Sequence, residues 1–155
     1  MSIAGGLHLA LERGAEAGCE SVGLFIKPSN QWKAKPLAEA DVALFCSRRT
    51  ELKTRHVVAH ASYLVNLASP DPALLEKSRA GFRIEMERCE AVGANYLVFH
   101  PGAHMGAGVE SGLATLAASL DRVHADCPGF RLKVLLEITC GAGTLLGSRF
   151  EELAT

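Results

Sequence analysis

Three apolar runs in this chain each end in a side chain that can bind a metal ion. They are residues 57–60, 96–100 and 134–137, and they end in His60, His100 and Glu137. His60 and His100 lie 40 residues apart, and His100 and Glu137 lie 37 residues apart; each interval is roughly the length of one strand, loop and crossover helix in a repeating β/α fold. In a barrel of such units the carboxyl ends of the strands converge on one face, so we expect the three side chains to meet in space.

The residue types at these three positions predict a zinc site. A single histidine at a strand end is more often a hydrogen-bonded core residue than a ligand, but here the strand-end position recurs in later units. Zinc accepts imidazole nitrogen and carboxylate oxygen in one tetrahedral shell. His60, His100 and Glu137 would therefore supply three metal ligands and leave one position for water, which is the catalytic position.

Helical and strand-like patterns alternate along the chain, with Gly and Pro at the joins. The predicted helices are residues 5–17, 37–53, 72–92 and 110–126 with another beginning at 150, and the predicted strands are 22–26, 56–60, 95–100 and 132–137. The strands are nearly continuous apolar runs, which is typical of a parallel sheet covered on both faces. The sequence therefore predicts the α/β class.

The length of the chain limits how much of a barrel it can form. A complete eight-unit barrel usually takes about 250 residues, whereas this chain has 155, with a helix at each end. Residues 1–155 are predicted to form a single domain, a partial parallel (β/α) barrel of the TIM type with about four to five units. The strands at 22–26 and 132–137 would be unpaired edges, which invite association. Self-association through these edges is therefore expected.

Charge and composition place few limits on the partner. A hydrophobic fraction of 48% with 21% charged residues predicts a globular protein rather than a disordered one. The net charge is −1 and the isoelectric point about 6.6, so no global basic field points to nucleic acid. Binding to DNA is neither supported nor excluded, and it would need a local patch or a metal site.

Cysteine usage and the amino terminus predict a soluble, cytoplasmic protein. The five cysteines are odd in number and include no CxxC pair, which fits reduced thiols that are mostly buried. The first residues lack a basic region followed by an apolar stretch, and no run approaches the ~20 apolar residues of a membrane span.

Several weaker motifs have more than one interpretation. Gly141, Gly143 and Gly147 follow a strand, and they could cradle a phosphate or simply form flexible turns. Residues 30–35 combine amides, two lysines and a tryptophan, a mixture that suits a nucleic-acid surface but is also common in solvated loops. His104 is expected to be a loop residue rather than a second ligand, because Pro101 and Gly102 disfavour a helix there.

The charged residues of the helix at 72–92 are expected to form its solvated face and to carry no function. They are Glu76, Lys77, Arg79, Arg83, Glu85, Glu87, Arg88 and Glu90.

Five segments together resemble the endonuclease IV family, the zinc-dependent apurinic/apyrimidinic endonucleases with a xylose isomerase-like barrel. The resemblance covers essentially the whole chain and is far more specific than the zinc spacing alone. The matching segments are residues 2–6, 27–36, 60–67, 100–104 and 137–143, followed by Leu146-Gly147 and Phe150-Glu151.

The resemblance implies a DNA-repair hydrolase. In the family three zinc ions hold the phosphate 5′ of an abasic site, and a metal-bound hydroxide attacks it, leaving a 3′-hydroxyl and a 5′-deoxyribose phosphate. His60 and His100 are then expected to be terminal ligands of the first zinc, and Glu137 the carboxylate that bridges to the second. His100 and Glu137 are also the expected catalytic residues, and double-stranded DNA containing abasic sites is the expected partner.

The resemblance also implies DNA contacts in two loops. Tyr63 and Leu64 match the family's minor-groove wedge, which enters the base stack beside the flipped abasic sugar. Asn30, Gln31 and Asn66 complete the expected DNA-contact set. The chain departs from the family pattern at three places. Asn30 stands where several members have a DNA-contacting arginine, and Ile138 and Ala142 replace polar residues of the loop after Glu137. The ligands that complete the second and third zinc sites have no counterpart in this chain.

Two alternatives to the repair endonuclease remain. One is a sugar isomerase or epimerase of the same fold with a single divalent metal on a His/Glu rim, which the Tyr63-Leu64 loop and residues 30–35 argue against. The other is a catalytically incomplete fragment that binds at most one zinc.

Overall fold

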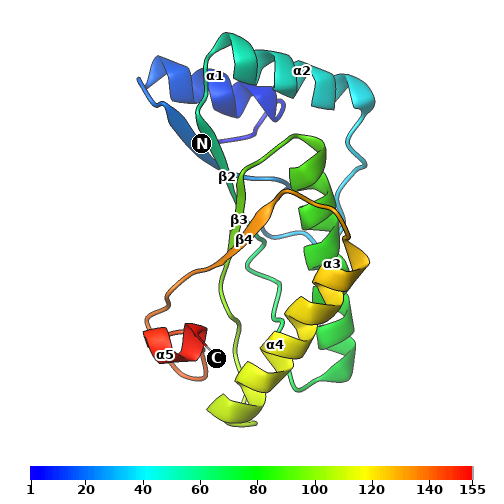
Figure 1. The fold of residues 1–155 in the computed structure, drawn as a ribbon, viewed down its shortest axis with the longest axis vertical. Helices are drawn as coiled ribbons and strands as arrows, with labels where there is room; N and C mark the ends of the chain where they lie inside the picture. The colour runs from blue at the N-terminus through cyan, green and yellow to red at the C-terminus, as the bar shows by residue number, and fades with distance from the viewer. Residues whose placement is uncertain (155) are drawn as a thin grey trace.

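The computed structural model describes residues 1–154 as one layer of helices packed on a small parallel sheet (Figure 1). The elements are α1 (His8–Glu16), β1 (Ser21–Phe25), α2 (Glu39–Glu51), β2 (His56–His60), α3 (Pro72–Ala91), β3 (Tyr96–Phe99), α4 (Val109–Asp126), β4 (Lys133–Leu136) and α5 (Phe150–Leu153). Each helix from α2 to α4 connects two consecutive strands. The predicted α/β class and partial barrel are confirmed.

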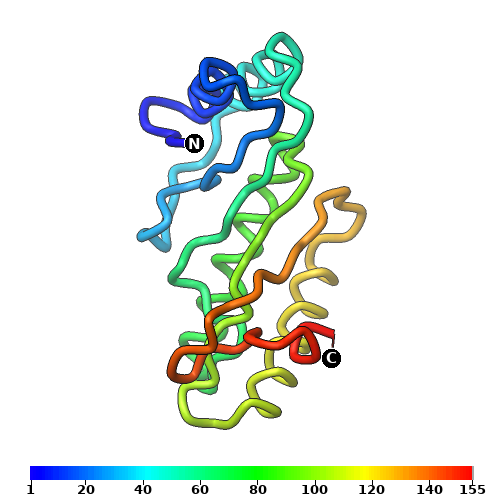
Figure 2. Tube along the Cα trace, turned by 90° about the vertical axis from the view of Figure 1, so that its left-hand side faces the viewer, coloured from blue at the N-terminus to red at the C-terminus, as the bar shows by residue number. Residues whose placement is uncertain are grey.

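The four strands lie in sequence order, β1-β2-β3-β4, and all are parallel. Within residues 1–154, β1 and β4 each pair on one side only. In Figure 1, α1 and α2 cover one end of the sheet, while α3 and α4 run side by side along it. The chain trace in Figure 2 shows α5, in red, beyond the end of β4 and beside α4.

Local sequence explains where the helices begin and end. The Asp71 carboxylate caps α3 by accepting the backbone N–H groups of Ala73 at 2.8 Å and Leu74 at 3.2 Å, and Pro72 occupies the first turn. The helix ends before Gly93, which has φ +67°. The first helix begins at His8 rather than at residue 5, because Gly5 and Gly6 have positive φ values of +88° and +149° that no helix allows.

Burial alternates along the strands, and this corrects the prediction of a sheet covered on both faces. Val57, Ala59, Leu97 and Phe99 are fully buried against the helices, whereas the alternate residues Val58 and Val98 are only half-buried. Leu135 on β4 is 40% exposed. The apolar character of both sets hid this difference in the sequence: one set packs on helices and the other lines the open, concave side of the partial barrel.

The helix-facing core is continuous. Phe45 of α2, Phe82 and Met86 of α3 and Leu116 of α4 pack with the buried strand residues into a single cluster. The tilted rings of Phe82 and Phe99 are in contact, with centroids 4.8 Å apart. All five cysteines are free; Cys89 and Cys127 are buried, and the other three are exposed, contrary to the expectation that most would be buried. No helix in the described part of the chain is long and apolar enough to cross a membrane.

Candidate metal centre

His60, His100 and Glu137 meet at the carboxyl end of the sheet, as predicted. One ligand atom from each lies within 4.8 Å of the others. The Nε2 atom of His60 is 2.8 Å from Oε2 of Glu137, and Nε2 of His100 is 3.2 Å from the same oxygen. The rings of His60 and His100 are perpendicular, with centroids 5.2 Å apart.

The strand register explains how the three side chains converge. His60 is level with Val98, not with His100, and Phe99 is level with Leu136. His100 and Glu137 therefore stand two residues beyond the row that contains His60. Because side chains alternate between faces with a period of two, all three still point to the concave side. The sequence predicts them at one level, and the sheet staggers them.

The contacts of the His60 ring orient its Nε2 atom toward Glu137. Its Nδ1 atom lies 2.7 Å from the carbonyl oxygen of Ala61, and because a carbonyl oxygen can only accept, Nδ1 carries a proton. The Nε2 lone pair of the neutral ring then faces the Glu137 carboxylate 2.8 Å away. Two acceptors at that distance need a proton or a metal ion between them.

The donor set fits zinc. Tetrahedral zinc with ligands at about 2.0–2.2 Å separates its ligand atoms by about 3.4 Å. The observed 2.8 and 3.2 Å are shorter, so the side chains would move apart by a few tenths of an ångström to admit the ion. The Nδ1–H of His60 bound to a backbone carbonyl is the usual outer-shell arrangement of a metal-binding imidazole. Side-chain exposures of 24% for His60 and about 40% for His100 and Glu137 leave a fourth position open to water or substrate.

Aromatic rings surround the two histidines. Tyr63 is 64% exposed, and its ring centroid is 5.3 Å from that of His60 and 5.7 Å from that of His100. Phe25, at the end of β1, contacts both Tyr63 and His60. A cavity of about 380 Å³ on the concave side is lined by Phe25, Val58, His60, Tyr63 and Glu137, among others. An exposed tyrosine thus stands at the edge of the metal centre.

The other predicted DNA-contact residues occupy two neighbouring loops. Asn30 and Gln31 are exposed, and Leu64 is half-buried beside Tyr63. The Asn66 amide is held inside: its Nδ2 donates to the Ala103 carbonyl at 2.9 Å, and its Oδ1 accepts the N–H groups of Ala68 and Ala103. The Asn66 side chain therefore ties its own loop to the loop after β3, and direct contact of this side chain with DNA stays a prediction.

A buried ion pair beneath these loops was missed in the sequence. Lys27 and Glu85 are 2% and 1% exposed, with Nζ 3.2 Å from Oε1. Burial raises the pKa of the Glu85 carboxyl, while Lys27 and the Ser62 N–H act in the opposite direction. Glu85 is thus not on a solvated face, and the assignment of all the α3 charges to such a face is wrong. Spacing contained the signal, because residues 78, 82, 85 and 89 share one helical stripe, and all four are buried.

The glycine-rich segment behaves as a turn. The N–H groups of Gly147 and Ser148 donate to the Glu152 carboxylate at 2.7 and 3.2 Å, so they are not free to cradle a phosphate. The same segment forms an isolated bridge between Leu145 and Ala103. His104 lies in the adjoining loop, as predicted, where its Nδ1 accepts the N–H groups of Gly106 and Gly108.

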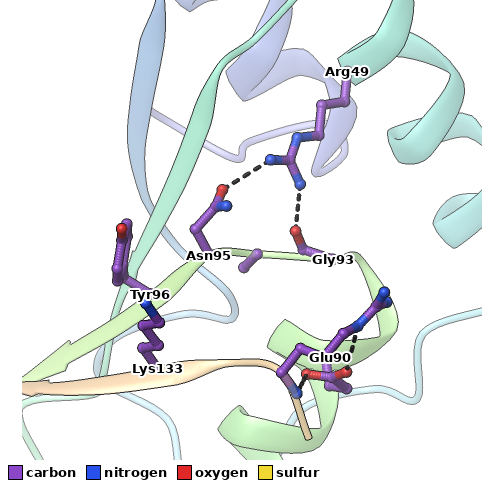
Figure 3. A pocket seen from close by; sticks show the side chains of 8 residues that line it. Arg49, Glu90, Gly93, Asn95, Tyr96 and Lys133 are labelled. Carbon is purple, nitrogen blue, oxygen red and sulfur yellow. Dashed lines mark hydrogen bonds and ion pairs between the residues drawn. The ribbon is translucent and has the colours of Figure 1, made fainter.

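A second cavity, of about 430 Å³, lies at the opposite, amino-terminal end of the strands and has a structural role (Figure 3). Arg49 reaches into it from α2 and donates to the Asn95 side chain at 2.8 Å and to the Gly93 carbonyl. The Glu90 carboxylate accepts the N–H groups of Arg131 and Leu132. These polar groups satisfy the backbone of the turns before β3 and β4.

Comparison with known proteins identifies the family. The family description "Xylose isomerase-like TIM barrel" matches residues 11–155. The chain belongs to this family. Over 153 residues it is 44% identical to the probable endonuclease 4 of Citrifermentans bemidjiense, covering 99% of this chain and 54% of that protein. The resemblance to endonuclease IV is confirmed.

Solved structures agree with this assignment. The crystal structure of endonuclease IV from Thermus thermophilus superposes with a TM-score of 0.84 at 33% identity, covering 99% of this chain and 55% of that one. D-allulose 3-epimerase from Methylomonas sp. superposes with a TM-score of 0.68 at 21% identity over 99% of this chain and 52% of that one, and so shares the fold. The chain spans about half the length of the relatives it matches.

Proposed function

We propose that this chain is part of a zinc-dependent DNA-repair endonuclease that hydrolyses the phosphodiester bond 5′ of an abasic site. Water adds to phosphorus, the P–O3′ bond breaks, and the proton of water passes to the departing 3′ oxygen. The products are a 3′-hydroxyl and a 5′-deoxyribose phosphate. The observation that carries the proposal is the His60/His100/Glu137 centre with an exposed tyrosine at its edge, in a chain similar to proteins named endonuclease 4.

Each side chain at the centre has a role in this proposal. A zinc ion bound there would acidify water and neutralise charge on the phosphate. His60 and His100 would hold the ion through their ring nitrogens, and the Ala61 carbonyl fixes the His60 ring. Glu137 would supply the carboxylate between the two imidazoles, and its side chain is 43% exposed.

The loops would provide recognition of the damaged site. Tyr63 and Leu64 enter the minor groove at the abasic step, where the missing base lowers the cost of unstacking. Asn30 and Gln31 contact the strand from the neighbouring loop, and both are exposed. Because the amides of Asn30 and Gln31 are uncharged, they displace no counterions from the phosphates, and the affinity for DNA should depend only weakly on salt concentration. A cytoplasmic location belongs to the same proposal.

The open side of the sheet is proposed to be covered by a second copy of the chain. Both edge strands are unpaired on one side within the described residues, and they are parallel. In a two-fold dimer, β4 of each copy would pair with β1 of the other, closing an eight-stranded barrel and removing both edges. The half-exposed Val58, Val98 and Leu135 would become its interior. Native mass spectrometry of the zinc-loaded chain tests this: a dimer supports closure, and a monomer at micromolar concentration overturns it.

A nicking assay tests the activity. The substrate is a labelled duplex with one tetrahydrofuran abasic analogue, and an undamaged duplex serves as the control substrate. Zinc-dependent cleavage 5′ of the analogue, lost in Glu137→Gln and kept in His124→Ala on the exposed side of α4, is the expected result. If the zinc-loaded chain does not cleave the duplex, the result supports the alternative of an incomplete fragment that binds a single zinc. Epimerisation of a ketohexose would support the sugar-epimerase alternative.

A further inference from the structure

One stripe of α3 holds the loop at residues 27–36 in place. Glu85 pairs with Lys27, and Arg88 donates to the carbonyl oxygens of Ile26 at 3.2 Å and Lys35 at 2.8 Å. The stripe continues one turn away, where the Trp32 ring lies on Gly81 and under the ammonium of Lys77. Residues 77, 81, 85 and 88 are spaced by four, four and three, so they form one line along the helix. In Figure 1 this loop, in light blue, passes beside α3.

The buried pair at the centre of this stripe also holds the second loop. Both carboxylate oxygens of Glu85 accept the N–H of Ser62, at 3.0 and 3.3 Å. The Ser62 hydroxyl donates to the Ser29 carbonyl at 2.6 Å and accepts the N–H of Leu64 at 3.3 Å. Lys27 completes the network by donating to the Gln31 carbonyl at 2.6 Å. An unbroken chain of contacts, buried at the ion pair and the Ser62 N–H and partly buried at its two ends, therefore joins Gln31 in one loop to Leu64 in the other.

The burial of this network argues against a role in stability alone. Removing a carboxylate and an ammonium from water is costly, and apolar side chains of similar volume often serve a fold as well or better. An ion pair can, however, supply what apolar side chains cannot. Lys27 offers a donor to one loop, and Glu85 offers an acceptor to the other. The pair thus fixes two irregular backbones relative to each other.

We propose that Lys27 and Glu85 are positioning residues that make the 27–36 loop and the Tyr63-Leu64 loop one rigid unit, and that discrimination of abasic from intact DNA depends on this coupling. The effect on DNA recognition rests on the proposed function, whereas the coupling of the two loops does not depend on it. Insertion of Tyr63 and contact at Asn30 then occur together, because neither loop can shift alone. Preorganisation of this kind lowers the entropy lost on binding.

The test is the double variant Lys27→Met/Glu85→Leu, which removes both polar ends and keeps the volume. Its matched control is Arg83→Met/Glu87→Leu, because Arg83 and Glu87 form an exposed ion pair on the same helix. Both proteins are checked by thermal unfolding to be fully folded at the assay temperature, and for an unchanged zinc affinity, measured by competition with a chelating dye. Those two checks separate positioning from loss of the fold or of the metal centre.

Loop coupling is read without DNA by hydrogen exchange and by fluorescence. In the double variant, amides in both 27–36 and 61–67 should exchange faster together. Acrylamide quenching of Trp32, the single tryptophan of the chain, should rise. The control should resemble the wild type in both. Faster exchange confined to one loop, or in neither, overturns the coupling.

Selectivity is read with the tetrahydrofuran duplex and its undamaged counterpart. The preference of the double variant for abasic DNA should fall roughly tenfold, the cost of ordering one or two free side chains, and Tyr63→Ala should cost less in that background than in the wild type. An unchanged preference in the double variant overturns the link to recognition. A wild-type chain that shows no preference for abasic DNA refutes the proposed function and, with it, the DNA consequence of the pair; the exchange result still decides the coupling.

Discussion

Stability offers a direct measure of how the Lys27–Glu85 pair is solvated. Glu85→Leu alone would leave the Lys27 ammonium, 2% exposed, without a counter-charge. It would also remove the acceptor of the Ser62 N–H. Breaking one side of a buried pair typically costs about 3–5 kcal/mol. That cost is a large part of the roughly 5–15 kcal/mol expected for the whole domain.

The double variant predicts a different outcome. With Lys27→Met added, no uncompensated charge remains, so most of this loss should be recovered. The Ser62 N–H still lacks its acceptor in the double variant, which leaves a residual cost of about 1–3 kcal/mol. For a domain of this size each kcal/mol shifts the unfolding temperature by about 2–4 °C. The single variant should therefore unfold about 6–20 °C lower than the wild type, and the double variant should unfold between the two.

Thermal and urea unfolding followed by circular dichroism, with the metal chelated, would measure both variants. Chelation removes the stabilisation contributed by zinc, so that only the pair is compared. A single variant as stable as the wild type would mean that Lys27 reaches water in solution. A double variant as unstable as the single one would mean that the side-chain shapes, and not the charges, account for the loss. Either result would refute the electrostatic argument.

Three further predictions follow from the same structure. His100→Ala should weaken zinc binding by more than the 10–100-fold typical of losing an outer-shell partner, whereas His124→Ala should not; a chelator competition would measure this, and equal affinities would exclude His100 as a ligand. In Lys27→Met the Glu85 carboxyl loses a group that lowers its raised pKa. Its folded pKa then lies further above 4.5, so stability should rise as the pH falls from 7 through that pKa, more than in the wild type; a flat stability difference in urea titrations between pH 7 and 5 would contradict it. Asp71→Ala should cost about 1 kcal/mol in thermal unfolding by removing the α3 cap, and Asp71→Asn should keep most of the wild-type stability. An Asp71→Ala variant as stable as the wild type would mean that water replaces the cap at the two backbone N–H groups.

The strands and the meeting of His60, His100 and Glu137 could be predicted from sequence because local signals coincide there. Each ligand directly follows or ends an apolar strand of four or five residues, and parallel strands bring such positions to one edge. The cap of α3 could also be predicted, since Asp is a preferred N-cap residue and Pro is preferred in the first turn of a helix, as at Asp71 and Pro72. These features need only neighbouring residues for their interpretation.

Features that depend on distant residues were missed or misplaced. The relative level of His60 and His100 depends on the register of β2 and β3, which no local pattern specifies. The half-exposure of Val58 depends on what covers the concave face. The charge of Glu85 favours a solvated position and outweighs its place in the helical repeat; Lys27, 58 residues earlier in the chain, is what makes its burial tolerable.

The metal centre also constrains the order in which the protein can fold. His60 and Glu137 are separated by 77 residues, and each ligand arrives on a different β/α unit. In the unfolded chain these ligands lie far apart and would bind an ion only weakly. High affinity for the ion would arise only after β2, β3 and β4 are aligned. Such long-range contacts form slowly. We expect zinc uptake to be a late event in folding, so the appearance of tight binding would mark the moment at which the three units have docked.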